Sequence, residues 1–463
     1  LRSDASAKFA PQNYWGMFPS WSAGWVISDE KWFDKDKTKI DFLKIRGSFG
    51  ILGKDNVNAW LWTQLYTRNP DKGPIFGTNS STNTSATIRM PKQGVNPDVH
   101  WDKTYKTNFG IDMAFLKNRM SANLDFYYDM GREMFASHQG TSYYPNTVGI
   151  QPAPENFGEV DTYGVELSLG WKDKIGKDMS YWVKLTTGYN DNKIRETGWK
   201  AAYDFDKLVR NERSDRGLWG YECIGMFRSY QEINEYFDKY SITKYLGNTK
   251  ENVHPGMLIY KDVRGQYDES TGTFGPADGI VDEQDYIKIS HRASNPYGGT
   301  LNFGFSYKDF SISAQFGASW GAYSLVPTTM RKESYSEYSN VSAMWKDMFV
   351  YEDIYDANNI VTVAQNRNAK YPNIRYSSVN GAPSTFWKVS AATVQLRNMT
   401  VAYALPKEWL KIIGISSCRF NLTCQNVFNF LNPYPEGAWA SWAGSYGYYP
   451  NLRKFTLGVN VSF

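Results

Sequence analysis

A strict period-two alternation of apolar and polar residues recurs along almost the whole chain and constrains its fold more than any other feature. The clearest segment is the last one, in which Phe455, Leu457, Val459, Val461 and Phe463 alternate with small and polar residues. Successive side chains of a β-strand point to opposite faces of its sheet. The alternation therefore predicts strands with one apolar face and one polar face.

Similar segments bring the prediction to about eleven strands. They cover residues 21–28, 43–51, 109–115, 120–128, 163–171, 181–185, 301–307, 310–318, 394–405, 418–425 and 455–463. Near Asn398 and Met399 the alternation changes parity. An extra residue in one strand has this effect, so we expect a β-bulge there.

The apolar content of the chain lies in aromatic rings more than in aliphatic side chains. Aromatic residues make up 16% of the sequence, whereas all hydrophobic residues reach only 41% and the mean hydropathy is −0.54. A helical membrane protein would show apolar runs of about 18 residues or more, and the sequence contains none. A transmembrane barrel fits the composition, because only alternate residues face lipid and aromatic girdles mark both interfaces.

The connections between the predicted strands alternate between short and long. The short ones cover 116–119, 172–178, 308–309 and 406–414, and the long ones cover roughly 53–99, 136–156, 192–295, 320–383 and 428–450. Outer-membrane barrels have tight periplasmic turns and long extracellular loops. We therefore predict an all-β fold, a transmembrane antiparallel β-barrel with long extracellular loops.

The strand count also predicts which part of a barrel this is. Single-chain bacterial barrels have even numbers of strands, and a last strand that ends in the periplasm gives this chain an extracellular start. Residues 1–463 are thus expected to be the C-terminal part of a barrel.

Several segments resemble the SusC/RagA class of TonB-linked outer-membrane proteins. Asn156–Val160 followed by Gly164–Leu167 resembles the N-x-G-x-V…G-V-E strand motif of that class. Four further segments resemble the penultimate hairpin of that class: Thr385–Val389, Leu396–Pro406, Cys418–Phe420 and Gln425–Phe428. The terminal Phe463 matches the last-strand signal for outer-membrane assembly.

The resemblance implies a 22-strand barrel, of which this chain is the second half, with the plug domain and early strands N-terminal to it. It implies active import of an oligosaccharide or oligopeptide across the bacterial outer membrane, with a SusD-like surface lipoprotein and the TonB complex as partners. Two other functions remain open. One is a passive porin or structural barrel in outer-membrane lipid, and the other is a soluble all-β carbohydrate-binding protein or glycosidase.

Catalytic and nucleic-acid-binding motifs are missing from the sequence. The four histidines lack metal-ligand spacing, and neither a nucleophile elbow nor a phosphate loop occurs. We therefore predict that the protein is not an enzyme. The net charge of +4 is spread without a long basic block, so nucleic-acid binding is not expected. The three cysteines do not predict a disulfide framework.

One acidic segment resembles the latter half of a calcium loop. In Asp278-Gly-Ile-Val-Asp-Glu-Gln-Asp285 the glycine allows a sharp turn, the Ile280 carbonyl is placed to coordinate, and an acid follows five residues later. The predicted ligands of Ca²⁺ or Mg²⁺ are Asp262, Asp278, Ile280, Asp282 and Asp285. The resembled family commonly carries D-x-N-G-D-G-x-I-D-x-x-D here. This chain has an insertion after Asp262, and Arg264 replaces an expected ligand. The alternative is an acidic solvated loop.

The last long connection is rich in rings, with Trp439, Trp442, Tyr446 and Tyr448. Aromatic faces stack on sugars and are common in partner contacts, so these four residues are predicted to contact substrate or partner. The alternative is packing between loops or a place in the interfacial girdle.

Overall fold

The structure is a computed structural model. It describes residues 1–69, 87–89, 94–136, 139–140, 147, 150, 152–197, 199–200, 210–268, 270–331, 342–412, 414–431, 434 and 452–463. Among these residues no helix has both the length and the apolar character needed to cross a membrane.

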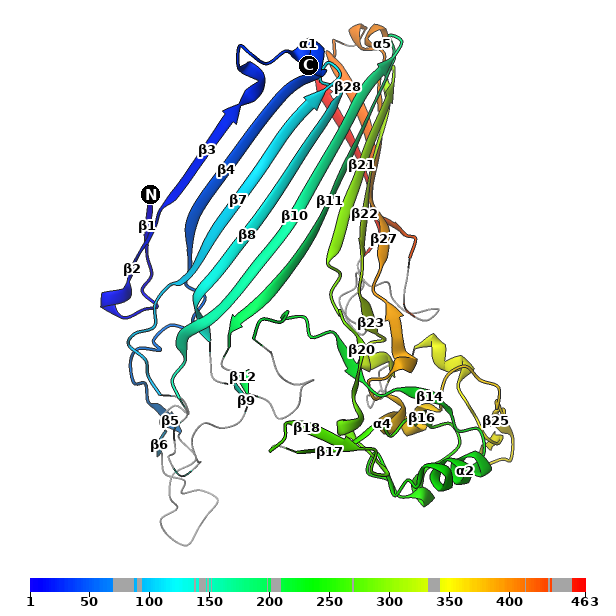
Figure 1. Cartoon of the computed structure of the whole chain (residues 1–463). Coiled ribbons are helices and arrows are strands. Elements are labelled where there is room, and N and C mark those ends of the chain that lie inside the picture. Colours follow the sequence, from blue (N-terminus) through cyan, green and yellow to red (C-terminus); the bar gives the residue numbers. More distant parts are fainter. Residues whose placement is uncertain are drawn as a thin grey trace. The chain divides into compact units, whose positions relative to one another are not determined.

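Eleven of the described strands form one sheet, in the order in which they occur along the chain (Figure 1). They are β3 (Ser20–Val26), β4 (Ile40–Lys54), β7 (Asp102–Phe115), β8 (Met120–Ala136), β10 (Glu155–Ile175), β11 (Met179–Glu196), β21 (Tyr297–Tyr307), β22 (Phe310–Trp320), β27 (Thr393–Ala404), β28 (Ser417–Asn429) and β29 (Lys454–Ser462). Within this sheet, all strand pairs whose register is described are antiparallel. Each predicted strand corresponds to one of these eleven, so the all-β antiparallel prediction is confirmed.

The chain divides into two compact units. The first consists of Leu1–Gly170 with Gly188–Ser214, and the second of Trp171–Thr187 with Asp215–Phe463. Strands β10 and β11 contribute residues to both.

In the first unit, the alternation produces an apolar row across four strands. Ile45 lies opposite Trp25 on one side and Ile111 on the other, and Ile111 lies opposite Leu124. Trp25 leaves 51% of its surface exposed. Exposed apolar side chains in continuous rows indicate a face that an apolar medium covers.

The opposite face of the same strands carries charged groups that pair with one another. Arg46 lies 3.1 Å from Asp112 and 2.7 Å from Asp125, and these partners come from the next two strands. The guanidinium crosses above Gly110, where an added Cβ would lie only 2.4 Å from its central carbon. A side chain at this position would have to displace the guanidinium from its place over the glycine.

The second unit repeats this two-faced pattern in its last three strands. Phe420 lies opposite Tyr403 and Val459, and Leu422 lies opposite Leu457, of which 74% is exposed. On the other face, the hydroxyls of Thr400 and Thr423 lie 3.2 Å apart, and Thr456 is the next residue across the sheet. All three cysteines of the chain are free thiols, in agreement with the sequence.

The predicted bulge is present in β27. Gln315 pairs with Asn398 whereas Phe316 pairs with Leu396, which leaves Arg397 as the extra residue. The register also shifts here in the pairing with β28, where Leu396 pairs with Phe428 and Asn398 with Gln425, so that the extra residue lies in β28. The prediction is confirmed, one residue before the predicted position.

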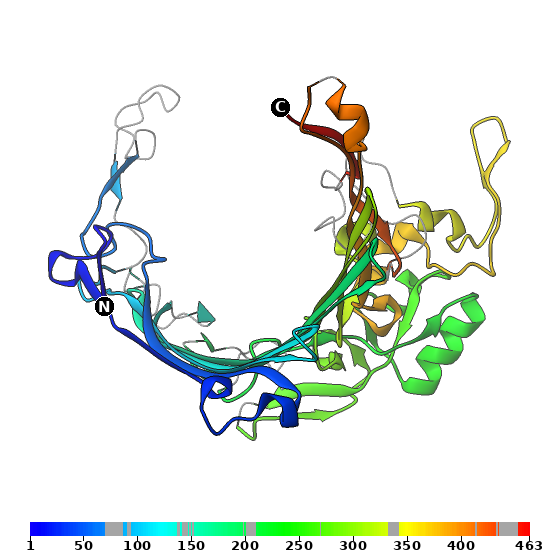
Figure 2. The same cartoon turned by 90° about the horizontal axis from the view of Figure 1, so that it is seen from above.

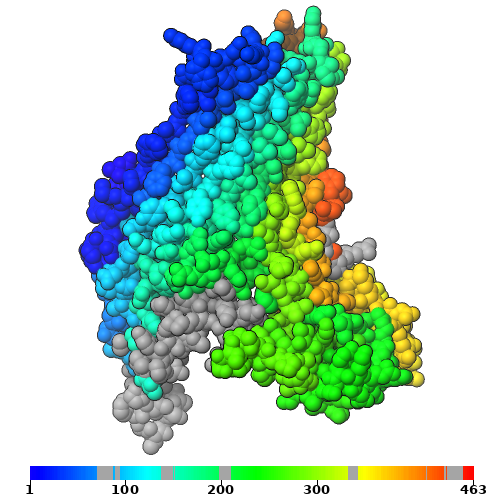
Figure 3. Space-filling view, viewed as in Figure 1, coloured from blue at the N-terminus to red at the C-terminus, as the bar shows by residue number. Residues whose placement is uncertain are grey.

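Two of the long connections, which the sequence presents only as loops, fold together into a body with its own core. The described residues of 215–296 and 321–392, here called the loop body, lie at one end of β21, β22 and β27, and helix α5 (Lys407–Lys411) lies at the other (Figure 1). In the space-filling view the loop body is a packed lobe in green and yellow (Figure 3). Its core includes Trp387, Tyr221, Tyr260 and Phe349. Trp345, which lies in the long connection 320–383, is 5% exposed and packs in this core.

Helix α2 (Tyr230–Tyr240) shows how the sequence builds this body. Ser229 caps its start by accepting the backbone N–H of Glu232 at 3.2 Å, and Ser241 ends it with a φ of 54°. Ile233, Tyr236 and Phe237 are buried. The i, i+3, i+4 spacing places these three residues on one face, which packs into the core.

The remaining elements are short. The other helices are α1 (Lys35–Thr38), α3 (Thr328–Arg331) and α4 (Ser377–Asn380). The small strands form two-stranded pairs: β1 (Arg2–Ala5) with β2 (Trp15–Phe18), β5 (Thr67–Asn69) with β6 (Thr87–Arg89), β9 (Gln139–Gly140) with β12 (Trp199–Lys200), β13 (Leu218–Gly220) with β20 (Ile287–Ser290), β14 (Cys223–Met226) with β16 (Leu258–Tyr260), β15 (Lys244–Tyr245) with β19 (Ile280–Val281), β17 (Arg264–Asp268) with β18 (Thr273–Pro276), β23 (Tyr323–Leu325) with β26 (Lys388–Ser390), and β24 (Ile354–Tyr355) with β25 (Val361–Val363).

The two faces of β29 predict opposite responses to a charge. Leu457→Arg places a cation on the apolar face and should destabilise the barrel by about 2–4 kcal/mol for a position near the membrane midplane. Thr456→Arg is the matched control, one residue away on the polar face, and should be tolerated. The measurement is the yield of heat-resistant, assembled full-length protein in outer membranes. Equal yields for the two variants would contradict the assignment of the faces.

Candidate functional site

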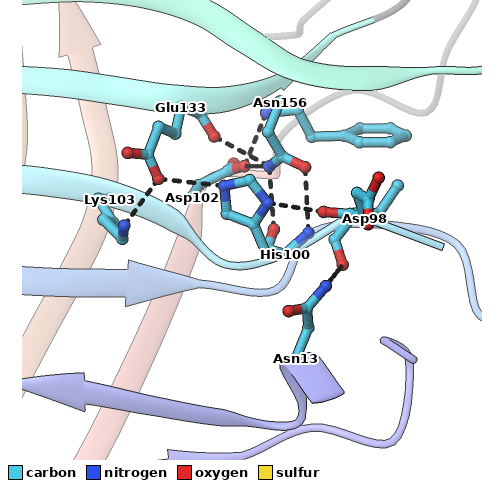
Figure 4. A network of polar contacts seen from close by, with 9 residues as sticks. Asn13, Asp98, His100, Asp102, Lys103, Glu133 and Asn156 are labelled. Carbon is cyan, nitrogen blue, oxygen red and sulfur yellow. Dashed lines mark hydrogen bonds and ion pairs between the residues drawn. The ribbon is translucent and has the colours of Figure 1, made fainter. Parts of the chain in front are cut away.

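Asn156 joins the ends of three strands in the first unit (Figure 4). Its side-chain amide donates hydrogen bonds to the backbone carbonyls of His100 and Glu133, each at 2.9 Å. Its side-chain oxygen accepts the backbone N–H of His100 at 3.1 Å. Because His100 precedes β7, Glu133 lies in β8 and Asn156 is near the start of β10, one side chain holds all three strand ends.

Charged groups surround this junction. Lys103 Nζ lies 2.7 Å and His100 Nε2 lies 3.0 Å from the same oxygen of Glu133. Glu133 has a φ of 51°, a left-handed conformation that costs a non-glycine residue about 1–2 kcal/mol. Asp102 accepts the backbone N–H of Phe135 at 2.7 Å. These contacts hold a strained turn of the backbone in place.

These residues offer hydrogen bonds and charge, and none of them is a hydroxyl or thiol nucleophile. Their effect is to fix where the connections 55–101 and 137–154 leave the strands. In the sequence, Asn156 stood out only as part of a family motif, and no pattern indicated His100 or Glu133. The available signal was an asparagine at the start of an alternating strand. At such a position a side-chain amide can make the hydrogen bonds that a neighbouring strand would otherwise make to the backbone.

The predicted cation loop lies in the loop body, and its carboxylates accept backbone N–H groups. Asp262 accepts from Gly279 at 2.7 Å, Asp278 from Ile280 at 2.9 Å and Asp282 from Gln284 at 2.8 Å. The insertion after Asp262 forms the β17–β18 hairpin. Arg264 points its guanidinium at the carbonyls of Gln284 and Tyr286.

Asp285 is the centre of this loop. It is fully buried, and its two oxygens accept the backbone N–H groups of Val263, Arg264 and Asp282 at 2.7–3.1 Å. Burial raises the pKa of Asp285 to about 6, and the nearby charge of Asp262 adds to this shift. Burial also raises the pKa of Asp262, to which Asp278 contributes.

The loop partly fits a cation. Oδ1 of Asp262 is buried and accepts no hydrogen bond from the described residues, so one oxygen has a free lone pair beside a second acid. However, among the described residues no three His, Cys, Asp or Glu side chains are already grouped around a metal position. The structure therefore brings Asp262 and Asp285 together, whereas Asp278 and Asp282 mainly stabilise turns.

Two other predicted sites stay predictions. Trp439, Trp442, Tyr446 and Tyr448 lie outside the described residues. Phe463 follows β29 and leaves 91% of its surface exposed, which is compatible with recognition but does not test an assembly signal.

Known proteins resemble the chain along its whole length. It is 24% identical to TonB-dependent receptor P39 of Formosa agariphila and 25% identical to TonB-dependent receptor SusC of Bacteroides thetaiotaomicron. Each alignment covers 100% of this chain, and 44% and 42% of the respective relative. The chain thus spans less than half the length of these relatives. A scan against family models found no match.

Solved structures agree on the fold. A structure of the RagAB peptide transporter superposes with a TM-score of 0.68 at 19% identity, covering 100% of this chain and 45% of the solved one. The RagAB peptide importer in its 'open-open' state gives a TM-score of 0.66 at 18% identity, covering 99% and 44%. The homologues are TonB-dependent receptors that include SusC, and the fold is the barrel portion of such transporters. The resemblance drawn from the sequence is confirmed.

Removing the Asn156 side chain should loosen the three strand ends. Asn156→Ala deletes several hydrogen bonds, each contributing about 0.5–1.5 kcal/mol, so local opening should become about tenfold or more easier. Hydrogen–deuterium exchange of residues 96–103 and 131–136 measures this. Asn426→Ala, which removes a single described bond to Leu452 O, is the control. Unchanged exchange in Asn156→Ala would show that the junction does not hold these ends.

Proposed function

We propose that this chain, homologous along its entire length to the TonB-dependent receptors, forms the C-terminal half of the barrel of an outer-membrane importer. The cargo is a nutrient oligomer, either an oligosaccharide or an oligopeptide. A SusD-like surface lipoprotein and the TonB complex are its proposed partners, the latter acting through the N-terminal region of the full-length protein. The similarity of the whole of this chain to receptors that include SusC is the observation that carries this proposal.

The architecture supports a conduit more than a soluble binding protein. Apolar pairs such as Trp21 with Phe49 and Phe109 with Phe126 remain exposed on one face of the sheet, where a soluble protein would cover them. The other face carries paired charges around Arg46, as a wet lumen requires. A soluble glycosidase is disfavoured by both features.

The remaining alternative is a passive porin, and energy coupling separates the two functions. We expect uptake of a labelled cargo oligomer to stop when the gene is deleted and when a protonophore dissipates the proton gradient. Complementation with the full-length gene should restore it. Uptake that continues with the protonophore would favour the porin.

The four aromatic residues Trp439, Trp442, Tyr446 and Tyr448 are proposed to contact cargo or partner. Alanine variants at these positions can be tested in the same uptake assay.

We also propose that Ca²⁺, or Mg²⁺ in its place, binds in the acidic loop through Asp262 and Asp285, with Asp278, Asp282 and the Ile280 carbonyl as the other predicted ligands. The buried free oxygen of Asp262 and the raised pKa of Asp285 support this, because a cation would neutralise two adjacent carboxylates. Bound Ca²⁺ would fix the loop and would take no part in a reaction.

The pH dependence of binding follows from Asp285. Its pKa in the folded protein, about 6, is above the unfolded value of about 3.9, so in metal-free protein its contribution to stability is complete below pH 4 and is lost as pH rises through 6. Ca²⁺ needs the ionised form. We therefore expect Ca²⁺ to raise the melting temperature at pH 7.5 and to have little effect at pH 5.

Two asparagine variants give a matched comparison. Asp278→Asn keeps the acceptor for Ile280 N–H but removes a charge, and it should weaken binding by calorimetry. Asp268→Asn in the adjacent hairpin should not. Absence of a binding heat and of a melting shift with Ca²⁺ at pH 7.5 would leave the loop as a turn stabilised by its own hydrogen bonds.

A further inference from the structure

A hairpin that projects from the loop body carries apolar side chains that no described residue covers. It consists of residues 352–365 and contains β24 and β25, and we call it the arm. All of its residues are exposed, including Ile354, Tyr355, Ile360, Val361 and Val363, with exposed fractions from 36% to 62%. Figure 2 shows it in yellow, extending away from the rest of the loop body. Monomeric proteins rarely leave such a group in water without a binding role.

The arm exposes apolar groups on both of its faces. Ile354 pairs with Val363, and Tyr355 pairs with Val361. Ile354 and Tyr355 are consecutive and point to opposite faces, whereas Val361 and Val363 are two residues apart, and the register shifts between the two pairs. Each face of the arm therefore carries at least one apolar side chain. Packing against the loop body could bury only one face. The geometry therefore suits insertion into a groove of another molecule.

The tip of the arm is rigidly built. Asp356 accepts the backbone N–H groups of Asn358 at 2.9 Å and Ile360 at 2.8 Å, and its own N–H donates to the Ile360 carbonyl at 2.9 Å. Asn359 takes the left-handed conformation with a φ of 61°, which asparagine tolerates.

The base of the arm is clamped to the loop body. Gln365 donates its backbone N–H to Asp353 at 2.6 Å and its side-chain amide to the Tyr351 carbonyl at 2.9 Å. Arg367 donates to the same carbonyl at 3.0 Å, and its guanidinium lies 4.3 Å from the centre of the Tyr351 ring. A two-stranded hairpin is marginal by itself in water. These clamps hold it in one shape before any partner arrives, which lowers the entropic cost of binding.

Charge indicates which partner the arm fits. Residues 352–365 contain Glu352, Asp353 and Asp356 and no lysine or arginine. An anionic membrane surface would repel this segment. Two copies of the arm facing each other across a two-fold axis would also repel. A protein groove with an apolar floor and a basic rim is complementary to it.

We propose that the arm is a docking element for the SusD-like surface lipoprotein, which it enters with Ile354, Tyr355, Ile360 and Val361. This inference rests on the proposed function, which places the loop body at the cell surface with that lipoprotein as partner. The acidic residues at the base and tip orient the arm against a basic rim on the lipoprotein.

The test uses the full-length transporter, tagged and purified in detergent from its own outer membrane, with mass spectrometry to identify and quantify the co-purified SusD-like lipoprotein. The arm variant combines Ile354→Thr, Ile360→Thr and Val361→Thr, because threonine keeps the strand propensity and removes apolar area. Ile224→Thr, at an exposed position elsewhere in the loop body, is the matched control. We expect the arm variant to weaken the affinity for the purified lipoprotein at least tenfold and the control to leave it unchanged.

A second variant addresses charge. Glu352→Lys should slow association with the lipoprotein at low salt and lose this effect at high salt. Unchanged melting temperatures in all variants establish that the loop body remains folded. If the triple variant unfolds the loop body, the single substitution Ile360→Thr replaces it. Ile360 is the most exposed of the five apolar residues of the arm.

The outcomes separate the two levels of the proposal. Lipoprotein retained at the wild-type ratio by the arm variant overturns the arm as docking element and leaves the proposed function intact. If the wild-type transporter co-purifies with no SusD-like lipoprotein, both the proposed partner and the proposed role of the arm are wrong. A variant that keeps the lipoprotein but changes from dimer to monomer by light scattering overturns the proposal in favour of a second copy.

Discussion

The requirement that every backbone polar group in hydrocarbon be hydrogen-bonded within the protein governs the rest of this structure. A meander of long antiparallel strands meets it, with each strand paired to its chain neighbours through registers such as the fourteen pairs of β4 and β7. Once the backbone is fixed in this way, only alternate side chains meet lipid. The apolar row through Ile45 and the ionic cluster of Arg46 are therefore two consequences of one ladder.

Beyond the ladder, the chain is stabilised in different ways. The strand ends at Asn156 are joined by side-chain hydrogen bonds, because the ladder has stopped and the backbone turns through the left-handed Glu133. The loop body instead has an aromatic core around Trp387 and Tyr260, with tyrosine hydroxyls donating to backbone carbonyls. Rigid connections of this kind would give the proposed importer fixed surfaces for cargo and partners, and the arm is proposed as one such surface.

The strands, their faces and the bulge at Arg397 could be predicted from the sequence, because period two and its loss of parity are local signals. The loop body could not, because its core joins Tyr221 with Trp387 across more than a hundred and fifty residues, and no periodicity links them. The junction at Asn156 was missed for a related reason. Its partners at His100 and Glu133 are backbone carbonyls, which carry no sequence signal. For the acidic loop, the spacing of its residues resembles a calcium loop and so indicated a cation, whereas most of its carboxylate oxygens accept backbone N–H groups.

If one face of this sheet contacts lipid and the other does not, lipid quenching distinguishes the two faces. In full-length protein with Cys223, Cys418 and Cys424 replaced by serine, a fluorophore attached at Leu457→Cys or at Thr456→Cys would be reconstituted into vesicles containing brominated lipids. We expect strong quenching of the probe at 457 and weak quenching of the probe at 456, although the two positions are adjacent. Equal quenching at both positions, or stronger quenching at 456, would contradict it.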